Sequence, residues 1–120
     1  MEQNYLENVR LQFEYYKSVG DKTFAQLSDS EFFWQYNNHS NSIAIIVNHL
    51  YGNMSSRWTD FLSSDGEKQW RQRDQEFQKI IKSKSELLNK WNEGWSILFA
   101  ALNTVNVGNF HTKVYIRNQE

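Results

Sequence analysis

The residues of this chain best suited to hold a metal are its three histidines, His39, His49 and His111. Neutral imidazole is a common ligand of zinc and nickel, and such a site needs at least three converging ligands. His39 lies in a polar Asn/Ser segment and His111 near the C-terminal end, whereas His49 lies inside a strongly predicted helix. At about 100° per residue, His49 flanks the apolar stripe of that helix, from which it could point into a groove toward a neighbouring helix. The residues alone favour a hydrogen-bonded boundary histidine over a ligand.

Other catalytic signatures are absent from the sequence. It contains no HExxH, His-x-x-x-His or Glu-x-x-His motif, no glycine-rich phosphate loop and no nucleophile elbow. It has no cysteine, which excludes a thiolate metal site, a cysteine nucleophile and a disulfide framework. Asp29 with Glu31, and Asp65 with Glu67, lie in predicted turns, where carboxylates usually cap the backbone or meet solvent.

Charged and aromatic residues alternate between Arg57 and Asp74. Because arginine forms bidentate pairs with carboxylates, we expect an ion-pair network that ties this connection to the fold, in preference to an anion site. The stretch Lys68–Lys90 is basic, with seven Lys and Arg against three acids. We interpret it as a solvated face, with nucleic-acid binding as the alternative, because a pI of about 6.3 is far below the basic range of nucleic-acid binders.

Composition indicates one globular domain spanning residues 1–120, with 39% hydrophobic and 22% charged residues. The absence of proline and the presence of only five glycines favour long, uninterrupted helices. No apolar run is long enough to cross a membrane, and the start of the chain lacks the basic and apolar regions of a signal peptide. We therefore expect a cytoplasmic protein that does not associate with membranes.

Hydrophobic periodicity predicts three long helices and an all-α fold. The first runs from Glu2 to Leu27, with Gly20 loosening its later part and a bend or restart near Asp21. The second starts after a cap at Ser40 or Asn41, ends at Leu62 and holds Gly52, expected at a close helix contact. The third starts at the cap Asp74 and continues for about thirty residues, with Gly94 at another close approach. Its seam comprises Phe77, Ile81, Lys84, Leu88, Trp91, Trp95, Leu98 and Leu102.

The connections carry their own signals. Ser28 and Glu31 have the spacing of a capping box, so a short helical turn is expected there. The second helix should end at Ser63–Gly66, with Gly66 in a left-handed conformation. After Thr104, apolar and polar residues alternate with a period of two, which predicts one strand or a small hairpin in an extended C-terminal tail.

The stretch between Asn41 and Phe77 resembles the DinB-like superfamily, and within it an uncharacterised bacterial subfamily described as a domain of unknown function. The residues that carry the resemblance are Asn41–Leu50 (NSIAIIVNHL), Gly52–Met54, Ser56–Leu62, Asp65–Lys68, Arg71, Arg73, Asp74, Glu76, Phe77, Trp91, Gly94, Trp95 and Tyr115–Arg117. The match is close over residues 41–77 and extends over most of the chain.

The resemblance implies an up-down four-helix bundle, often dimeric, that binds a divalent metal such as zinc or nickel through three histidines. One of these lies on the second helix, and His49 matches it; the other two form a spaced pair on the fourth helix. Some relatives are thiol S-transferases that use low-molecular-weight bacterial thiols. We expect this chain to stop before the fourth helix, so that His49 is the one ligand carried over and the bundle is incomplete.

Three functional hypotheses follow. The first is a metal-binding protein with thiol-transferase or hydrolase-type activity, inactive in this 120-residue form unless a partner chain supplies further ligands. The alternative is a non-catalytic dimerising stress-response scaffold. The least favoured is a nucleic-acid binder that uses Lys68–Lys90. We expect a homodimer, because three helices leave one apolar groove uncovered.

Overall fold

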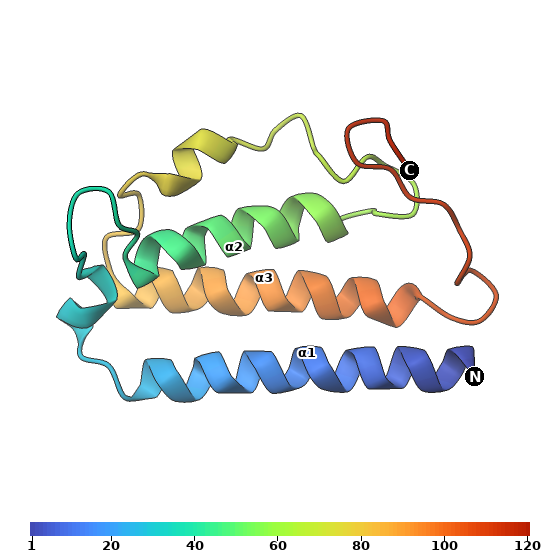
Figure 1. Cartoon of the computed structure of the whole chain (residues 1–120), viewed down its shortest axis with the longest axis horizontal. Helices are drawn as coiled ribbons and strands as arrows, with labels where there is room; N and C mark the ends of the chain where they lie inside the picture. Colours follow the sequence, from blue (N-terminus) through green and yellow to red (C-terminus); the bar gives the residue numbers. More distant parts are fainter.

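The computed structural model describes all 120 residues and contains three long helices, α1 (Glu2–Ala25), α2 (Ile43–Trp58) and α3 (Lys84–Thr104) (Figure 1). Two short 3₁₀ helices, η1 (Asp29–Phe33) and η2 (Arg73–Phe77), lie in the connections. The predicted all-α class is confirmed. The four-helix arrangement that the resemblance implies stays a prediction. None of the helices combines the length and the apolar composition that a membrane span requires.

The core lies where α3 packs against α2 and the first connection. Its largest fully buried hydrophobic side chains are Phe32, Val47 and Leu87. The close approach expected at Gly94 is present, since a Cβ there would lie 3.5 Å from the Cα of Tyr51. The resulting pair of helices positions the connection that carries the candidate site.

Helix α1 follows its prediction closely and packs along α3 through aromatic side chains. It continues through Gly20 and Asp21 without the predicted restart, and a Cβ at Gly20 would lie 2.4 Å from the Trp91 indole. The indole Nε1 of Trp91 donates a hydrogen bond to Asp21 over 2.8 Å, and Phe13 packs edge-on against Trp95. Only Phe24 of α1 is buried, so this helix depends on a single line of contacts.

The prediction that the third helix starts at Asp74 is wrong. Helix α3 begins at Lys84, where the side chain of Ser83 accepts a hydrogen bond from the Glu86 amide over 3.1 Å. Residues 74–83 form part of η2 and a non-helical segment instead. Ile81 in that segment is only 4% exposed, so its apolar character reflects packing into the core and not a helical stripe.

The boundaries of α2 also differ from the prediction. Its cap is Ser42, whose side chain accepts a hydrogen bond from the Ile45 amide, in place of Ser40 or Asn41. The helix ends at Trp58, a turn before Leu62, and the chain reverses through Asp60, which has a positive φ of 49°.

The connections contain one confirmed and two wrong predictions. The capping box of Ser28 and Glu31 is present. Gly66 is not left-handed; its lack of a side chain instead admits Ile116, whose Cγ1 would lie 3.0 Å from a Cβ there. The predicted strand in the C-terminal tail is replaced by an isolated bridge between Ile116 and Gln119. An extended segment with no partner strand has no ladder to join.

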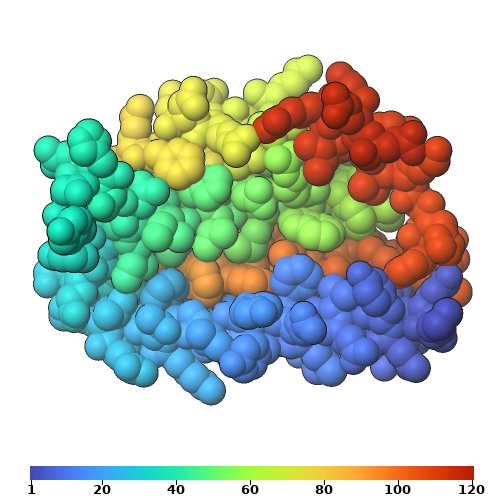
Figure 2. Space-filling model, in the orientation of Figure 1, coloured from blue at the N-terminus to red at the C-terminus, as the bar shows by residue number.

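The molecule is long and open, with extents of 47 × 31 × 21 Å. Its radius of gyration is 16.0 Å, against about 14 Å expected for a domain of this size. Its accessible surface of 8159 Å² exceeds by about 1,300 Å² the surface typical of a folded monomer of this mass. Figure 2 shows side chains of α3 between α1 and α2, so the excess surface includes an uncovered face there.

Candidate functional site: the His49–Glu76–Arg71 network

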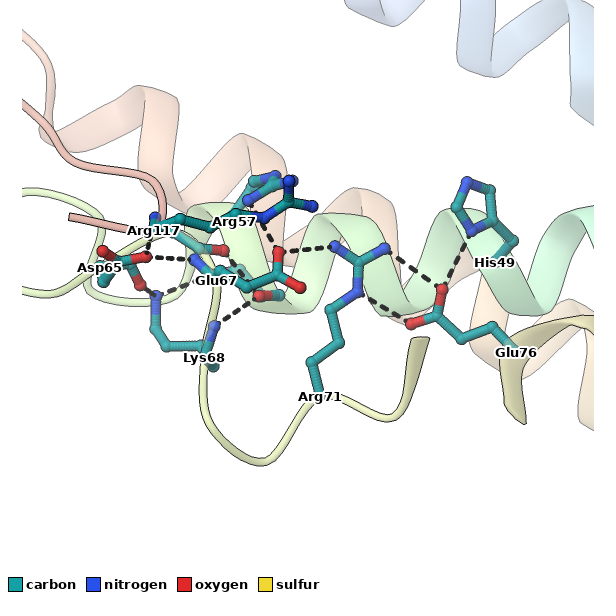
Figure 3. Close-up of polar contacts among 10 residues, drawn as sticks. His49, Arg57, Asp65, Glu67, Lys68, Arg71, Glu76 and Arg117 are labelled. Carbon is teal, nitrogen blue, oxygen red and sulfur yellow. Dashed lines mark hydrogen bonds and ion pairs between the residues drawn. The ribbon is translucent and has the colours of Figure 1, made fainter. Parts of the chain in front are cut away.

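His49 lies on α2, with its side chain 28% exposed. The helical pattern left open which neighbour its ring would meet, and the ring contacts η2, with Nδ1 facing Glu76 (Figure 3). The Nδ1 atom lies 3.0 Å from Oε1 of Glu76. The imidazole also stacks on the ring of Phe77, with centroids 4.7 Å apart and an interplanar angle of 29°. Two consecutive residues of η2 therefore fix the position of the imidazole.

Glu76 is a buried carboxylate held by Arg71. The Nε atom of Arg71 donates to Oε2 of Glu76 over 3.0 Å, and its Nη2 donates to Oε1 over 3.2 Å. The Arg71 side chain is only 1% exposed. The hydrogen bonds to Glu76 raise the pKa of Arg71; burial opposes this change, and the charges of Glu76 and Glu67 add to it. The result is a bidentate, largely desolvated ion pair directly behind His49.

Small and polar residues on one face of α2 allow this pair to lie close to the helix. Gly52 faces the carboxylate, and a Cβ at this position would lie 1.9 Å from Oε2 of Glu76. One turn earlier, the side-chain amide of Asn48 donates to the backbone carbonyl of Glu76 over 3.2 Å. One turn later, Ser56 is completely buried under the connection. The close contact expected at Gly52 is therefore made with a side chain of η2.

The network continues away from His49 along α2. Glu67 accepts from Arg71 at 3.3 Å and pairs with Arg57 at 3.0 Å, so basic and acidic side chains alternate in the order Arg57, Glu67, Arg71, Glu76 and His49 (Figure 3). This arrangement confirms the ion-pair network expected between Arg57 and Asp74. It attaches the whole connection from residue 67 to residue 76 to α2.

Ser56 and Lys68 form a second attachment point, which is structural. The Oγ of Ser56 donates to the Gly66 carbonyl over 2.6 Å and accepts from the Lys68 amide. The ammonium of Lys68 donates to the carbonyls of Ser56 and Asp65. Burial lowers the pKa of Lys68, and the nearby charges of Asp60 and Asp65 oppose that change. Because the Ser56 hydroxyl is buried and bonded on both sides, it is not placed to act as a nucleophile.

The carboxylates predicted to lie in turns do bind backbone amides. Asp65 accepts from the amides of Asn118, Glu67 and Arg117 at 2.6, 2.7 and 2.8 Å, and these hydrogen bonds lower its pKa. Glu31 accepts from Ser28, which lowers its pKa in the same way. Neither group is arranged for general acid–base chemistry, and Asp65 fastens the C-terminal tail to the connection.

The contact with Glu76 determines which nitrogen of His49 is available. A carboxylate only accepts hydrogen bonds, so Nδ1 of His49 must carry the proton that fills the 3.0 Å contact. In the neutral ring, the lone pair then lies on Nε2, which is directed away from Glu76 (Figure 3). Metal-binding histidines are commonly oriented in this way by a carboxylate on their other nitrogen. The donor chemistry at Nε2 therefore suits a divalent metal.

The three histidines are not brought together. His111 contacts Glu2 through Nε2 at 2.8 Å, and His39 lies in the first connection, where its backbone amide donates to Asn37. No group of three or more His, Cys, Asp or Glu side chains that could hold a metal occurs in the structure. Two imidazoles thus meet a carboxylate, the exposed His111 and the partly buried His49, and neither belongs to a complete set of ligands.

Sequence reasoning did not pair His49 with Glu76 and Arg71, because it assigned residues 74–77 to the third helix. A signal was available in Gly52. A glycine in the interior of an otherwise regular helix, one turn after a histidine, indicates that another group approaches the backbone closely. The group that approaches Gly52 is the buried carboxylate of Glu76.

Comparison with known proteins places the chain in a family. No curated protein and no solved structure matches it significantly. The family described as "Protein of unknown function (DUF1572)" matches residues 1–120. Because this match covers the whole chain, the protein belongs to the DUF1572 family.

Proposed function

We propose that this protein binds a divalent metal such as zinc or nickel and that His49 is one of the ligands. The observation that supports this proposal is the 3.0 Å contact between Nδ1 of His49 and Glu76, which leaves the Nε2 lone pair directed away from Glu76. The resemblance to DinB-like proteins, in which a histidine on the second helix binds metal, agrees with this choice. A bound metal would supply Lewis-acid chemistry that lowers the pKa of a thiol or of water.

The remaining ligands must come from outside the set of residues that surround His49, since no three-ligand group is present. We propose that a second copy of the chain supplies them and that the functional form is a homodimer. The excess surface of about 1,300 Å² is larger than the roughly 800 Å² that each partner buries in a stable complex of standard size. In this form, the activity would be thiol transfer from a low-molecular-weight thiol or a hydrolysis.

The test is the metal content of the full chain, purified without a chelator and without a histidine tag. We expect a substantial fraction of one metal equivalent per chain in the wild type and a loss of most of it in His49→Ala. The matched controls are His39→Ala and His111→Ala, which remove an imidazole from exposed positions and should retain the metal. A metal content that is negligible in the wild type, or equal in all three variants, would overturn the proposal.

A non-catalytic dimerising scaffold is the second candidate, and the exposed aromatic surface of α1 favours it. Tyr5, Tyr15 and Tyr16 are each more than half exposed. Large exposed apolar surfaces usually mark sites of interaction. A stable dimer without metal would support this function in place of the first.

A further inference from the structure

We propose that Arg71 is a positioning residue for His49, which it orients through Glu76. This inference rests on the proposed metal-binding function of His49. Arg71 donates to both oxygens of the Glu76 carboxylate, at 3.0 and 3.2 Å, and Oε1 of the same carboxylate accepts from Nδ1 of His49 at 3.0 Å. Arg71 acts on the imidazole by holding the group that selects its tautomer.

The bidentate contact fixes the carboxylate in one orientation. With both oxygens engaged by a planar guanidinium, Glu76 cannot rotate about its last side-chain bond without losing a hydrogen bond to Arg71. Glu76 has little alternative partner in solvent, because its side chain is 9% exposed. Oxygen Oε1 therefore remains at the position from which it accepts the proton on Nδ1.

The same contact also holds the ring that stacks on the imidazole. Phe77 follows Glu76 directly, and its ring lies nearly parallel to that of His49. Phe77 is 43% exposed, so packing in the core does not by itself hold this ring in place. Arg71 thus secures the hydrogen-bond partner and the stacking partner of His49 through one short helical turn.

Without Arg71, the tautomer of His49 should become mixed. A free histidine side chain prefers to carry its proton on Nε2, which places the lone pair on Nδ1. The Nδ1–H form at His49 therefore depends on a carboxylate that stays in place. An imidazole with its proton on Nε2 would present no lone pair at the nitrogen that faces away from Glu76, and metal binding there would weaken.

Arg57 provides a matched control within the same network. Like Arg71, it pairs with Glu67, and its side chain is largely buried, at 21% exposure. No hydrogen bond or ion pair joins it to Glu76 or His49. Replacing Arg57 by methionine removes the same charge from the same network and leaves the contact between Glu76 and His49 in place.

The first measurement is the ¹⁵N NMR spectrum of the neutral His49 imidazole in the metal-free full chain. We expect the Nδ1–H form to dominate in the wild type and in Arg57→Met, and the Nε2–H form to gain population in Arg71→Met. Arg71→Lys serves if Arg71→Met does not fold, since lysine keeps the charge and loses the bidentate geometry. An unchanged tautomer in the folded Arg71 variant would overturn the inference.

The second measurement is the affinity for Co²⁺ alone, added to the same proteins. We expect a loss of about 10- to 100-fold in the Arg71 variant and little change in Arg57→Met, as for other groups that orient metal-binding histidines. Equal losses in both variants would overturn the positioning role. A wild type that has the Nδ1–H form and does not bind Co²⁺ would refute the proposed function and leave the role of Arg71 in selecting the tautomer intact.

Discussion

Replacing Gly52 by alanine tests whether the Glu76 carboxylate is locked against α2. The added Cβ would lie 1.9 Å from Oε2 of Glu76 and 2.4 Å from its Cδ, which is closer than any real contact allows. Gly52 lies within α2, so the helix backbone is not free to retreat. The methyl group must therefore displace the carboxylate from Arg71 and His49.

Two opposing effects determine the size of the change in stability. Alanine in place of glycine stabilises a helix interior by about 1 kcal/mol. Displacing Glu76 leaves the buried guanidinium of Arg71 with Glu67 as its remaining partner, and breaking a buried pair typically costs about 3–5 kcal/mol. We expect the free energy of unfolding of Gly52→Ala to fall by about 2–4 kcal/mol.

Urea denaturation measures this difference, with Gly94→Ala as the matched control. With an m value of about 1–3 kcal/mol/M, the midpoint of Gly52→Ala should fall by an amount of order 1 M. A Cβ at Gly94 would make an ordinary contact at 3.5 Å with Sδ of Met54, so Gly94→Ala should be stabilised by up to about 1 kcal/mol. If Gly52→Ala proves as stable as Gly94→Ala, Glu76 is not held where the network requires it.

Two further predictions concern the C-terminal tail and the open face. Hydrogen bonds from the amides of Asn118, Glu67 and Arg117 lower the pKa of Asp65 in the folded protein. The ionised carboxylate therefore stabilises the docked tail above the ordinary carboxyl pKa of about 3.9. This stabilisation is lost as the pH falls through the lower folded-state pKa. Hydrogen exchange at the amides of Arg117 and Asn118, corrected for intrinsic rates, should accelerate over that acidic range. In Asp65→Asn, the exchange should already be faster at neutral pH. Unchanged rates would show that the tail docks by other contacts. Light scattering should give twice the monomer mass at micromolar concentration and a fall on dilution, whereas a constant monomer mass would refute the proposed homodimer.

The helical content was predictable because its signals are local. The helix α1 and the reciprocal hydrogen bonds of Ser28 and Glu31 depend on residues close in sequence, and both are present. Caps were harder to choose among several polar residues: Ser42, not Ser40 or Asn41, accepts the hydrogen bond that starts α2.

The error at the third helix arose because spacing does not record how a residue reaches the core. Phe77 and Ile81 continue the spacing of the α3 seam by coincidence; Phe77 stacks on His49, and Ile81 fills the core from a non-helical segment. The wrong start of the third helix also hid the contact between Glu76 and His49. Once residues 74–77 are taken out of the helix, Glu76 can fold back onto Gly52 and meet His49. Such a contact joins positions far apart in sequence, which periodicity does not constrain.

The position of α1 has a consequence for synthesis on the ribosome. This helix leaves the ribosome well before its partner side chains on α3; the hydrogen bond between Asp21 and Trp91 spans 70 residues. At about 5–20 residues per second, α1 waits roughly 4–14 s for that partner. Most of the stability of a helix in a protein comes from packing of its apolar face, and this one leaves Leu11, Tyr15 and Tyr16 exposed even after docking. The nascent chain therefore presents a tyrosine-rich, unpaired segment until α3 emerges, and chaperone contact is expected to concentrate there.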